Sequence, residues 1–387
     1  MAYYRKLDSG KWQVQVYMGK DPETGKPQRK YESFSTKREA KKWARRMEMQ
    51  AEQGVVVQTD MTVKEMLLKW FEEYAVVQTE KTTHDRYEII LKTHLIPALG
   101  HIKLDELKPD HIRTYLQKKR IGGRKDGKEG GLSEVTLLKH YKKLKQALNY
   151  MVKNKYILTN PADSVEAPKV DRRRKNKIVA LTKEEIGKLL KVAKENDPLL
   201  HDFIFLAVHT GMRRNELLGL EWDNVDFENK KIRVRKTLVW ENGNGSVLRN
   251  GTKTPSSNRN IDITDEIVEV LQKRKKKQEE FKDFLGENYH DEYNLVFCKE
   301  DGEKYFPGTY NRRYAKLRDK AGLDKEKTIH TLRHTHASIL LNLNEHPKIV
   351  QERLGHASIT QTIDTYSHLI PTLQAEAAQK ASKFLDA

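Results

Sequence analysis

The sequence predicts a multidomain protein in three parts: a small β-sheet plus a helix, an all-α segment, and a mixed, mainly α segment with a small antiparallel sheet. The chain has 387 residues, too many for one ordinary domain. Apolar residues alternate near its start and recur at helical spacing further on. A basic, apolar-poor linker is predicted at 167–177, between domains at 1–56, 60–166 and 178–387.

Composition points to a nucleic-acid partner. The chain is 37% hydrophobic and 33% charged, and its formal net charge is +18. Such an excess of positive charge is typical of proteins that bind polyanions such as DNA. We find no apolar stretch long enough to span a bilayer and no apolar core of a secretory signal at the N-terminus. Cys298 is the single cysteine, so we expect no internal disulfide and a cytoplasmic location.

The first part is predicted as strands followed by a helix. Apolar and polar side chains alternate over residues 12–18, turn residues follow, and a second strand is expected over residues 28–34. A capping-box pattern at residues 36–39 begins a basic helix that runs to about residue 53. The first 50 residues hold 13 Lys and Arg against 6 Asp and Glu, which favours a DNA-contacting module over a merely solvated face.

The second part is predicted to be helical throughout. A capping box at residues 62–65 begins its first helix, and the second helix ends at Pro97 and Gly100. A third helix begins near Pro109, and a fourth covers about residues 134–153. Lysines on the fourth helix form either a solvated face or a phosphate-contacting one.

The third part begins with apolar helix residues that end at Gly211. Arg213 then lies at the start of the next helix, where a guanidinium and free backbone amides can hold a phosphate. One strand is predicted over 232–239, a hairpin turn at 242–245, and a later strand over 260–263.

Histidines and one lysine add further candidates. The segment GTKTPSSNR places Lys253 in a loop, from which it can reach a ligand. In HTLRHTH, His330 and Arg333 are three residues apart and share a helix face. His330, His334 and His336 could also suggest zinc, but no acidic or cysteine ligand accompanies them in a recognisable pattern. We therefore expect no metal and no cofactor.

In this order, TGMRRNE, GTKTPSSNR, HTLRHTHAS and LGHASITQTIDTYSH resemble the tyrosine recombinase, or phage integrase, family. That family uses Arg, Lys, His-x-x-Arg, His or Trp, and Tyr. The resemblance is sharp over about 178–387. It also extends to a core-binding domain in the helical part and to the arm-binding module of mobile-element integrases at the start. It implies six catalytic residues: Arg213, Lys253, His330, Arg333, His356 and Tyr366.

The resemblance also implies the chemistry. Tyr366 attacks a DNA phosphate, forms a 3′-phosphotyrosyl link and frees a 5′-hydroxyl. Arg213 and Arg333 clamp that phosphate. Lys253 protonates the leaving oxygen, and His330 assists proton transfer around the tyrosine.

The remaining implications concern support and partners. His356 hydrogen-bonds the phosphate, and Glu216 supports the arginine motif. The tail over 371–387 is expected to form an amphipathic helix that packs either on its own domain or on a neighbouring protomer. The implied partners are double-stranded DNA at core and arm attachment sites and a homotetramer on DNA, with room for accessory proteins that bend DNA or set direction. No membrane partner is expected.

Two other readings compete. A type IB topoisomerase shares this chemistry, but the arm-binding module and the two-histidine motif set argue against it. A DNA-binding regulator with a decayed active site would have lost an arginine of the clamp or the tyrosine, and Arg213, Arg333 and Tyr366 are all present.

Overall fold

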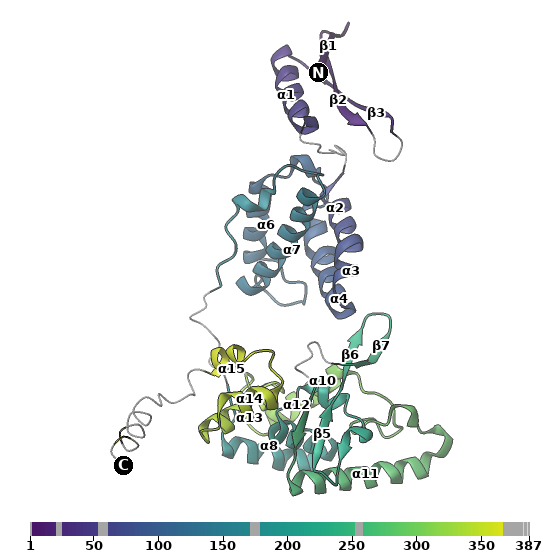
Figure 1. The fold of residues 1–387 in the computed structure, drawn as a ribbon, viewed down its shortest axis with the longest axis vertical. Coiled ribbons are helices and arrows are strands. Elements are labelled where there is room, and N and C mark those ends of the chain that lie inside the picture. Colours follow the sequence, from purple (N-terminus) through teal and green to yellow (C-terminus); the bar gives the residue numbers. More distant parts are fainter. Residues whose placement is uncertain are drawn as a thin grey trace. The chain divides into compact units, whose positions relative to one another are not determined.

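The computed structural model describes residues 2–20, 25–52, 61–170, 179–251 and 258–366, together with Ser382 and Leu385. The chain divides into two compact units, residues 1–173 and 174–387. Figure 1 shows the elements of each unit. Among the described residues, no helix combines the length and the apolar character needed to cross a membrane.

The chain begins with an antiparallel three-stranded sheet in the order β1-β2-β3, against which α1 packs (Figure 1). The elements are β1 (Ala2–Lys6), β2 (Trp12–Lys20), β3 (Pro27–Phe34) and α1 (Lys37–Glu52). The two expected strands and the helix are confirmed, whereas β1 was not predicted because its five residues contain little alternation. Residues 21–24 of the expected turn lie outside the described part. A small core joins sheet and helix: Val14, Val16, Ala40, Ala44 and Met47.

The helical domain contains α2 (Val63–Trp70), α3 (Val76–Gln78), α4 (Lys81–Ile89), α5 (Ile96–Leu99), α6 (Pro109–Ile121) and α7 (Glu134–Lys153). Two π-helical turns, Phe71–Ala75 and Ile90–Leu95, are inserted between consecutive helices. The capping box at the start of α2 is present: Oγ1 of Thr62 accepts the N–H of Glu65, and Glu65 accepts the N–H of Thr62. The bounds predicted for α7 are confirmed.

The prediction that Pro97 ends a helix was wrong. Pro97 lies in the first turn of α5, directly after the π-helical turn, and the helix ends at Gly100. A proline is tolerated in the first helical turn because its missing N–H would have no partner there. The wider π-turn, closed by the N–H of Ile96 donating to the carbonyl of Leu91, creates that new first turn inside a continuous helical run.

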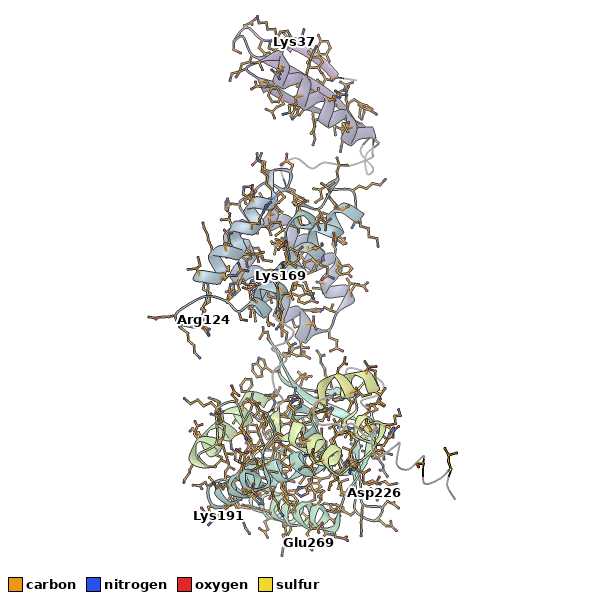
Figure 2. All side chains as sticks on the ribbon, turned by 90° about the vertical axis from the view of Figure 1, so that its left-hand side faces the viewer. Lys37, Arg124, Lys169, Lys191, Asp226 and Glu269 are labelled. Carbon is orange, nitrogen blue, oxygen red and sulfur yellow. The ribbon has the colours of Figure 1, made fainter. Side chains whose placement is uncertain are left out.

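The basic surface of the helical domain is not uniform. Nζ of Lys143 donates to the hydroxyl of Tyr87 at 2.6 Å, and Lys145 pairs with Asp163 at 2.8 Å. These two lysines therefore have protein partners, while Lys139 and Lys142 on the same helix are exposed. Figure 2 shows the side chains of all parts and Arg124 on the outward loop between α6 and α7.

The C-terminal unit is built around α9. Its helices are α8 (Lys183–Asn196), α9 (Pro198–Thr210), α10 (Arg214–Leu218), α11 (Asp265–Leu285), α12 (Pro307–Lys320), α13 (Thr331–Asn342), α14 (Pro347–Leu354) and α15 (Ile359–Tyr366). One sheet has the order β4-β5-β8, with β4 (Val225–Asp226), β5 (Lys231–Val234) and β8 (Arg259–Asp262). A separate hairpin pairs β6 (Lys236–Glu241) with β7 (Gly245–Asn250). Helices α8, α10, α11, α12 and α13 all contact α9.

The single strand predicted over 232–239 is two strands in different sheets. Ile232 and Val234 are buried in β5, but Leu238, not Thr237 or Val239, is buried in β6. The buried positions 232, 234 and 238 keep one alternation, so the sequence pattern does not mark the boundary between the two strands. Only the strand partners differ, because β5 pairs with β4 and β8 whereas β6 pairs with β7.

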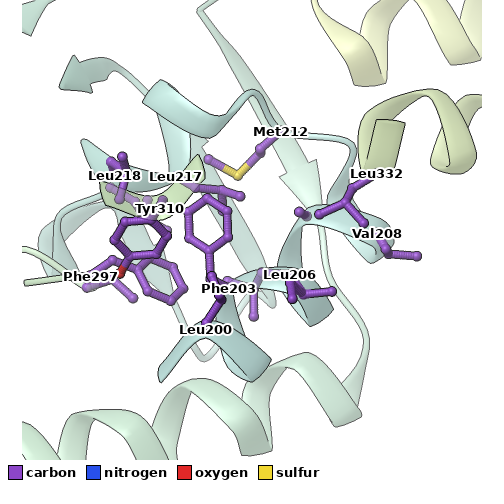
Figure 3. Packing of buried hydrophobic residues seen from close by; sticks show 14 of the residues in the cluster. Leu200, Phe203, Leu206, Val208, Met212, Leu217, Leu218, Phe297, Tyr310 and Leu332 are labelled. Carbon is purple, nitrogen blue, oxygen red and sulfur yellow. The ribbon is translucent and has the colours of Figure 1, made fainter. Parts of the chain in front are cut away.

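Aromatic packing holds α9 in place (Figure 3). The ring of Phe203 lies 5.2 Å from that of Phe297 and 4.6 Å from that of Tyr310, measured between centroids, and all three side chains are fully buried. These rings anchor the helix whose C-terminus leads into the site described below.

We expect Phe203→Ala to lower the opening free energy of α9 by about 3–5 kcal/mol, because it leaves a cavity in a close-packed core. Hydrogen–deuterium exchange of the α9 amides measures this change. Phe284→Ala is the matched control, since Phe284 is 85% exposed on α11. Equal exchange in the two variants would contradict the role assigned to Phe203.

Candidate active site

A tight backbone turn at Gly211 positions the first arginine. Helix α9 ends at Gly211, which adopts a left-handed conformation with φ 65°. A Cβ at Gly211 would lie 2.6 Å from the ring of His336, so only glycine fits. Arg213 follows as the N-terminal cap of α10, and its backbone N–H donates to Oε2 of Glu216 at 2.9 Å.

Glu216 is the buried acceptor of the site. Oε1 accepts from Nη1 of Arg213 at 2.6 Å, and Oε2 accepts from Nη2 of Arg259 at 2.9 Å. The Glu216 side chain is only 1% exposed. Burial by itself would raise the pKa of Glu216, but the positive charges around it, Arg259 foremost, lower that pKa to about 2. The carboxylate therefore stays charged and fixes both guanidiniums, in the supporting position predicted for it.

Arg259 ties this centre to the turn after α14. Its Nε donates to the carbonyl of Arg353 at 2.7 Å. Gly355 has φ 67°, and a Cβ there would lie 2.9 Å from Nη1 of Arg259. The carbonyl of Gly355 in turn accepts from Nη2 of Arg213 at 3.1 Å. A glycine is thus required both by the backbone conformation and by the close approach of Arg259.

Arg333 is a buried arginine with one guanidinium nitrogen that no described residue accepts from. The residue is 3% exposed on α13, and its Nη1 donates to the carbonyl of Gly211 at 2.8 Å. Its Nη2 is buried and has no hydrogen-bond partner among the described residues. Burial, followed by the charge of Arg213, lowers the pKa of Arg333 to about 9. A buried guanidinium nitrogen without a hydrogen-bond partner is costly, and an oxyanion such as a phosphate would satisfy it.

His330 and His356 have different surroundings. His330 caps α13 and keeps an exposed face, although neighbouring groups desolvate its other side. That desolvation and nearby arginines, Arg333 first, lower the pKa of His330. A cavity of about 530 Å³ is lined in part by His330 and Arg213. His356 is buried with Nδ1 2.8 Å from Oγ1 of Thr362, and burial beside the arginines lowers its pKa to about 3.

Tyr366 ends α15 with its side chain 1% exposed. Its hydroxyl lies 2.8 Å from Nδ1 of His334, on the facing helix α13. Burial raises the pKa of Tyr366 to about 12, and the charge of Arg333 opposes part of that rise. The phenol is therefore protonated at neutral pH.

The structure brings five of the six expected site residues into this one unit, and Lys253 lies outside the described residues. Sequence reasoning missed two contributors. Arg259 stands in the GTKTPSSNR motif, and His334 was weighed only as a metal ligand. Throughout the described ranges, no group of three or more His, Cys, Asp or Glu is placed to hold a metal. The histidines of α13 instead contact different partners, with His336 bonded to the carbonyl of Val208.

Three family profiles match successive parts of the chain. Residues 180–372 match the phage integrase family, residues 62–120 match the phage integrase N-terminal SAM-like domain, and residues 2–51 match an arm DNA-binding domain. The chain belongs to the phage integrase family. It is a tyrosine recombinase, and its multidomain architecture is that of the integrases.

Relatives along the whole length agree with this assignment. The integrase is 26% identical to the ICEBs1 integrase of Bacillus subtilis over 382 residues, covering 98% of this chain and 99% of the relative. It is 28% identical to a XerC-like tyrosine recombinase of Caldanaerobacter subterraneus over 390 residues, covering 97% of each.

Solved structures share the fold. The Tn1549 transposon integrase in complex with transposon right end DNA matches with a TM-score of 0.68 and 25% identity, over 84% of this chain and all of that one. A lambda integrase tetramer bound to a Holliday junction matches with a TM-score of 0.56 and 20% identity, over 94% of each chain. At that identity the lambda match supports the fold alone.

We expect Glu216→Gln to destabilise the integrase at neutral pH, because two guanidiniums lose their shared counter-charge. The pKa of Glu216 falls from 4.5 to about 2 on folding, so its stabilisation is present above pH 4.5 and is lost as the pH falls towards 2. The free-energy gap between wild type and variant should be about 3 kcal/mol at pH 7 and should shrink below pH 4.5.

Urea unfolding of both proteins from pH 7 to pH 3 measures this gap. Glu280→Gln on the exposed face of α11 is the matched control and should give no pH-dependent gap. A Glu216→Gln gap that stays constant as the pH falls would show that the carboxylate does not act through its charge.

Proposed function

We propose that this integrase inserts and excises a mobile DNA element by cleaving DNA strands through a 3′-phosphotyrosyl intermediate and rejoining them by way of a Holliday junction. One observation carries the proposal: the buried Nη2 of Arg333, without a partner among the described residues, in the same small centre as Tyr366 and Arg213. A scissile phosphate supplies the oxyanion that this nitrogen needs.

The chemistry follows from these groups. Oη of Tyr366 attacks phosphorus, loses its proton and forms the phosphotyrosyl bond, while the bond to the 5′ oxygen breaks. Negative charge grows on the non-bridging oxygens, and the fixed guanidiniums of Arg213 and Arg333 stabilise it. A 5′-hydroxyl from another strand then reverses the step, so the energy of the phosphodiester is kept.

Three further roles complete the proposal. Lys253, outside the described residues, protonates the leaving 5′ oxygen. His356 hydrogen-bonds the phosphate, for which its buried position beside Arg213 and Arg333 is suitable. His330 assists proton movement from the open side of the site, where it lines the cavity next to Arg213.

The domain plan serves the same function. We propose domains at 1–56 for arm-type DNA sites, 60–166 for core-type sites and 178–387 for catalysis, joined by the basic linker at 167–177. We propose that the active unit is a homotetramer on double-stranded DNA and that it acts in the cytoplasm. The match to an arm DNA-binding domain favours a recombinase over a topoisomerase.

We expect Tyr366→Phe to abolish the covalent protein–DNA adduct, because the variant lacks the attacking oxygen. The assay uses a nicked duplex that spans the junction between the element and its host DNA, which traps the adduct. DNA binding, measured by mobility shift, should be unchanged. An adduct formed by Tyr366→Phe would overturn the nucleophile assignment, and tight binding without adduct by the wild type would favour a DNA-binding regulator.

We expect Arg333→Lys to slow adduct formation by about 100- to 1,000-fold, since lysine keeps the charge but not the two-pronged donor geometry. Single-turnover cleavage of the same nicked duplex measures the rate. Lys191→Ala, exposed on α8, is the control and should cleave at the wild-type rate. A wild-type rate for Arg333→Lys would exclude the guanidinium from the transition state.

A further inference from the structure

We infer that His334 is a catalytic residue of this integrase: its Nδ1 takes the phenolic proton from Tyr366 during cleavage and returns it during religation. The inference rests on the proposed function, in which Tyr366 is the nucleophile. It assigns the proton-accepting role at the tyrosine to His334 rather than to His330, which the family resemblance suggested.

His334 contacts the hydroxyl of Tyr366 directly. Nδ1 of His334 lies 2.8 Å from Oη of Tyr366, and the ring centroids are 5.8 Å apart in an edge-on arrangement. His330 instead packs against the ring of His334 at 4.8 Å and lines the open cavity. Among the described hydrogen bonds, that to His334 is the one made by the tyrosine hydroxyl.

The burial of Tyr366 sets the direction of that hydrogen bond. The Tyr366 side chain is 1% exposed, so its hydroxyl proton needs a protein acceptor. Nδ1 of His334 is the acceptor at hydrogen-bond distance, which requires the tautomer with its proton on Nε2. In this tautomer the phenol donates along the line on which its proton must leave.

The surroundings of His334 keep its imidazole uncharged. Burial, with the nearby His330 and Arg333, lowers the pKa of His334 to about 4, so the imidazole is neutral at physiological pH. The groups that face it are His330 and Arg333 on its own helix, Tyr366 on α15, and His356 after α14. At neutral pH a neutral imidazole leaves Nδ1 able to accept the proton.

As the Tyr366 Oη–phosphorus bond forms, the proton of Oη moves to Nδ1 of His334, and the bond from phosphorus to the 5′ oxygen breaks. The departing oxygen takes a separate proton from the proposed acid, Lys253. In religation the attacking 5′-hydroxyl gives its proton back to Lys253, the bond between phosphorus and Oη of Tyr366 breaks, and His334 returns its proton to Oη. Because the phenol is a far weaker acid than protonated His334, transfer occurs only as the bond to phosphorus forms.

The test uses His334→Asn in the full-length chain, because asparagine can place an acceptor near the position of Nδ1 but cannot hold the proton. Single-turnover cleavage of the nicked duplex is followed from pH 6 to pH 9. We expect a loss of about 100-fold at pH 7 with DNA binding unchanged. The rate of the variant should then rise about tenfold per pH unit, because attack now requires a phenol already ionised by hydroxide.

A second measurement separates proton transfer from positioning. Replacing Tyr366 by 3-fluorotyrosine gives a more acidic phenol, and this should reduce the deficit of His334→Asn. A duplex with sulfur in place of the leaving 5′ oxygen removes the need to protonate the leaving group but does not help the phenol lose its proton. It should therefore leave the deficit of His334→Asn unchanged. His336→Asn, which removes another buried imidazole of α13, controls for loss of stability and should show neither signature.

The outcomes are distinct. His334→Asn cleaving at the wild-type rate, or slowed equally at every pH and with either phenol, overturns the inference. The same pH signature in His330→Asn but not in His334→Asn also overturns it and assigns the role to His330. If wild type forms adduct and Tyr366→Phe does not, the proposed function stands whichever result His334 gives. An adduct from Tyr366→Phe refutes the proposed function itself.

Discussion

The site depends on one buried carboxylate. Glu216 holds Arg213 and Arg259 by two short ion pairs, and through Arg259 it joins the end of α14 to the start of α10. Desolvating such a charge is costly, and only guanidiniums in fixed geometry offset that cost. The rest of the centre follows from this constraint: Gly355 must be a glycine to admit Arg259, and its carbonyl then accepts from Arg213.

This arrangement concentrates positive charge before any phosphate arrives. Arg333 is buried with one guanidinium nitrogen unpaired among the described residues, and Arg213 lies close enough to lower its pKa. The repulsion between the guanidiniums of Arg213 and Arg333 would be offset by an oxyanion bound between them. Preorganised charge of this kind stabilises the transition state more than the ground state. The same field keeps the histidines neutral, since burial near cations lowers the pKa of both His334 and His356.

The neutral imidazole of His334 lies beside the protonated phenol of Tyr366, the proposed nucleophile. The usual problem with a tyrosine nucleophile is that its proton must leave as it attacks. In this integrase the hydroxyl of Tyr366 already lies within hydrogen-bond distance of Nδ1 of His334, while His330 lines a cavity together with Arg213. In the proposed reaction these two histidines, one helical turn apart, act on different sides of the site. His330 is exposed at the cavity, and His334 contacts the hydroxyl of Tyr366, the proposed nucleophile.

The sequence by itself determined much of this protein, because local patterns set its elements: the capping box at Thr62, the helix break at Gly211 and the ordered motifs that contain Arg213, Arg333 and Tyr366. The sequence pattern wrongly predicted a helix end at Pro97, because no feature of the pattern indicates a π-helical turn. Only the tertiary structure decided which motif residues touch. The contacts that matter join segments more than 30 residues apart, Arg259 to Glu216 and His334 to Tyr366. The pairing of such segments is fixed by how the helices pack around α9, and no local spacing in the sequence encodes that packing.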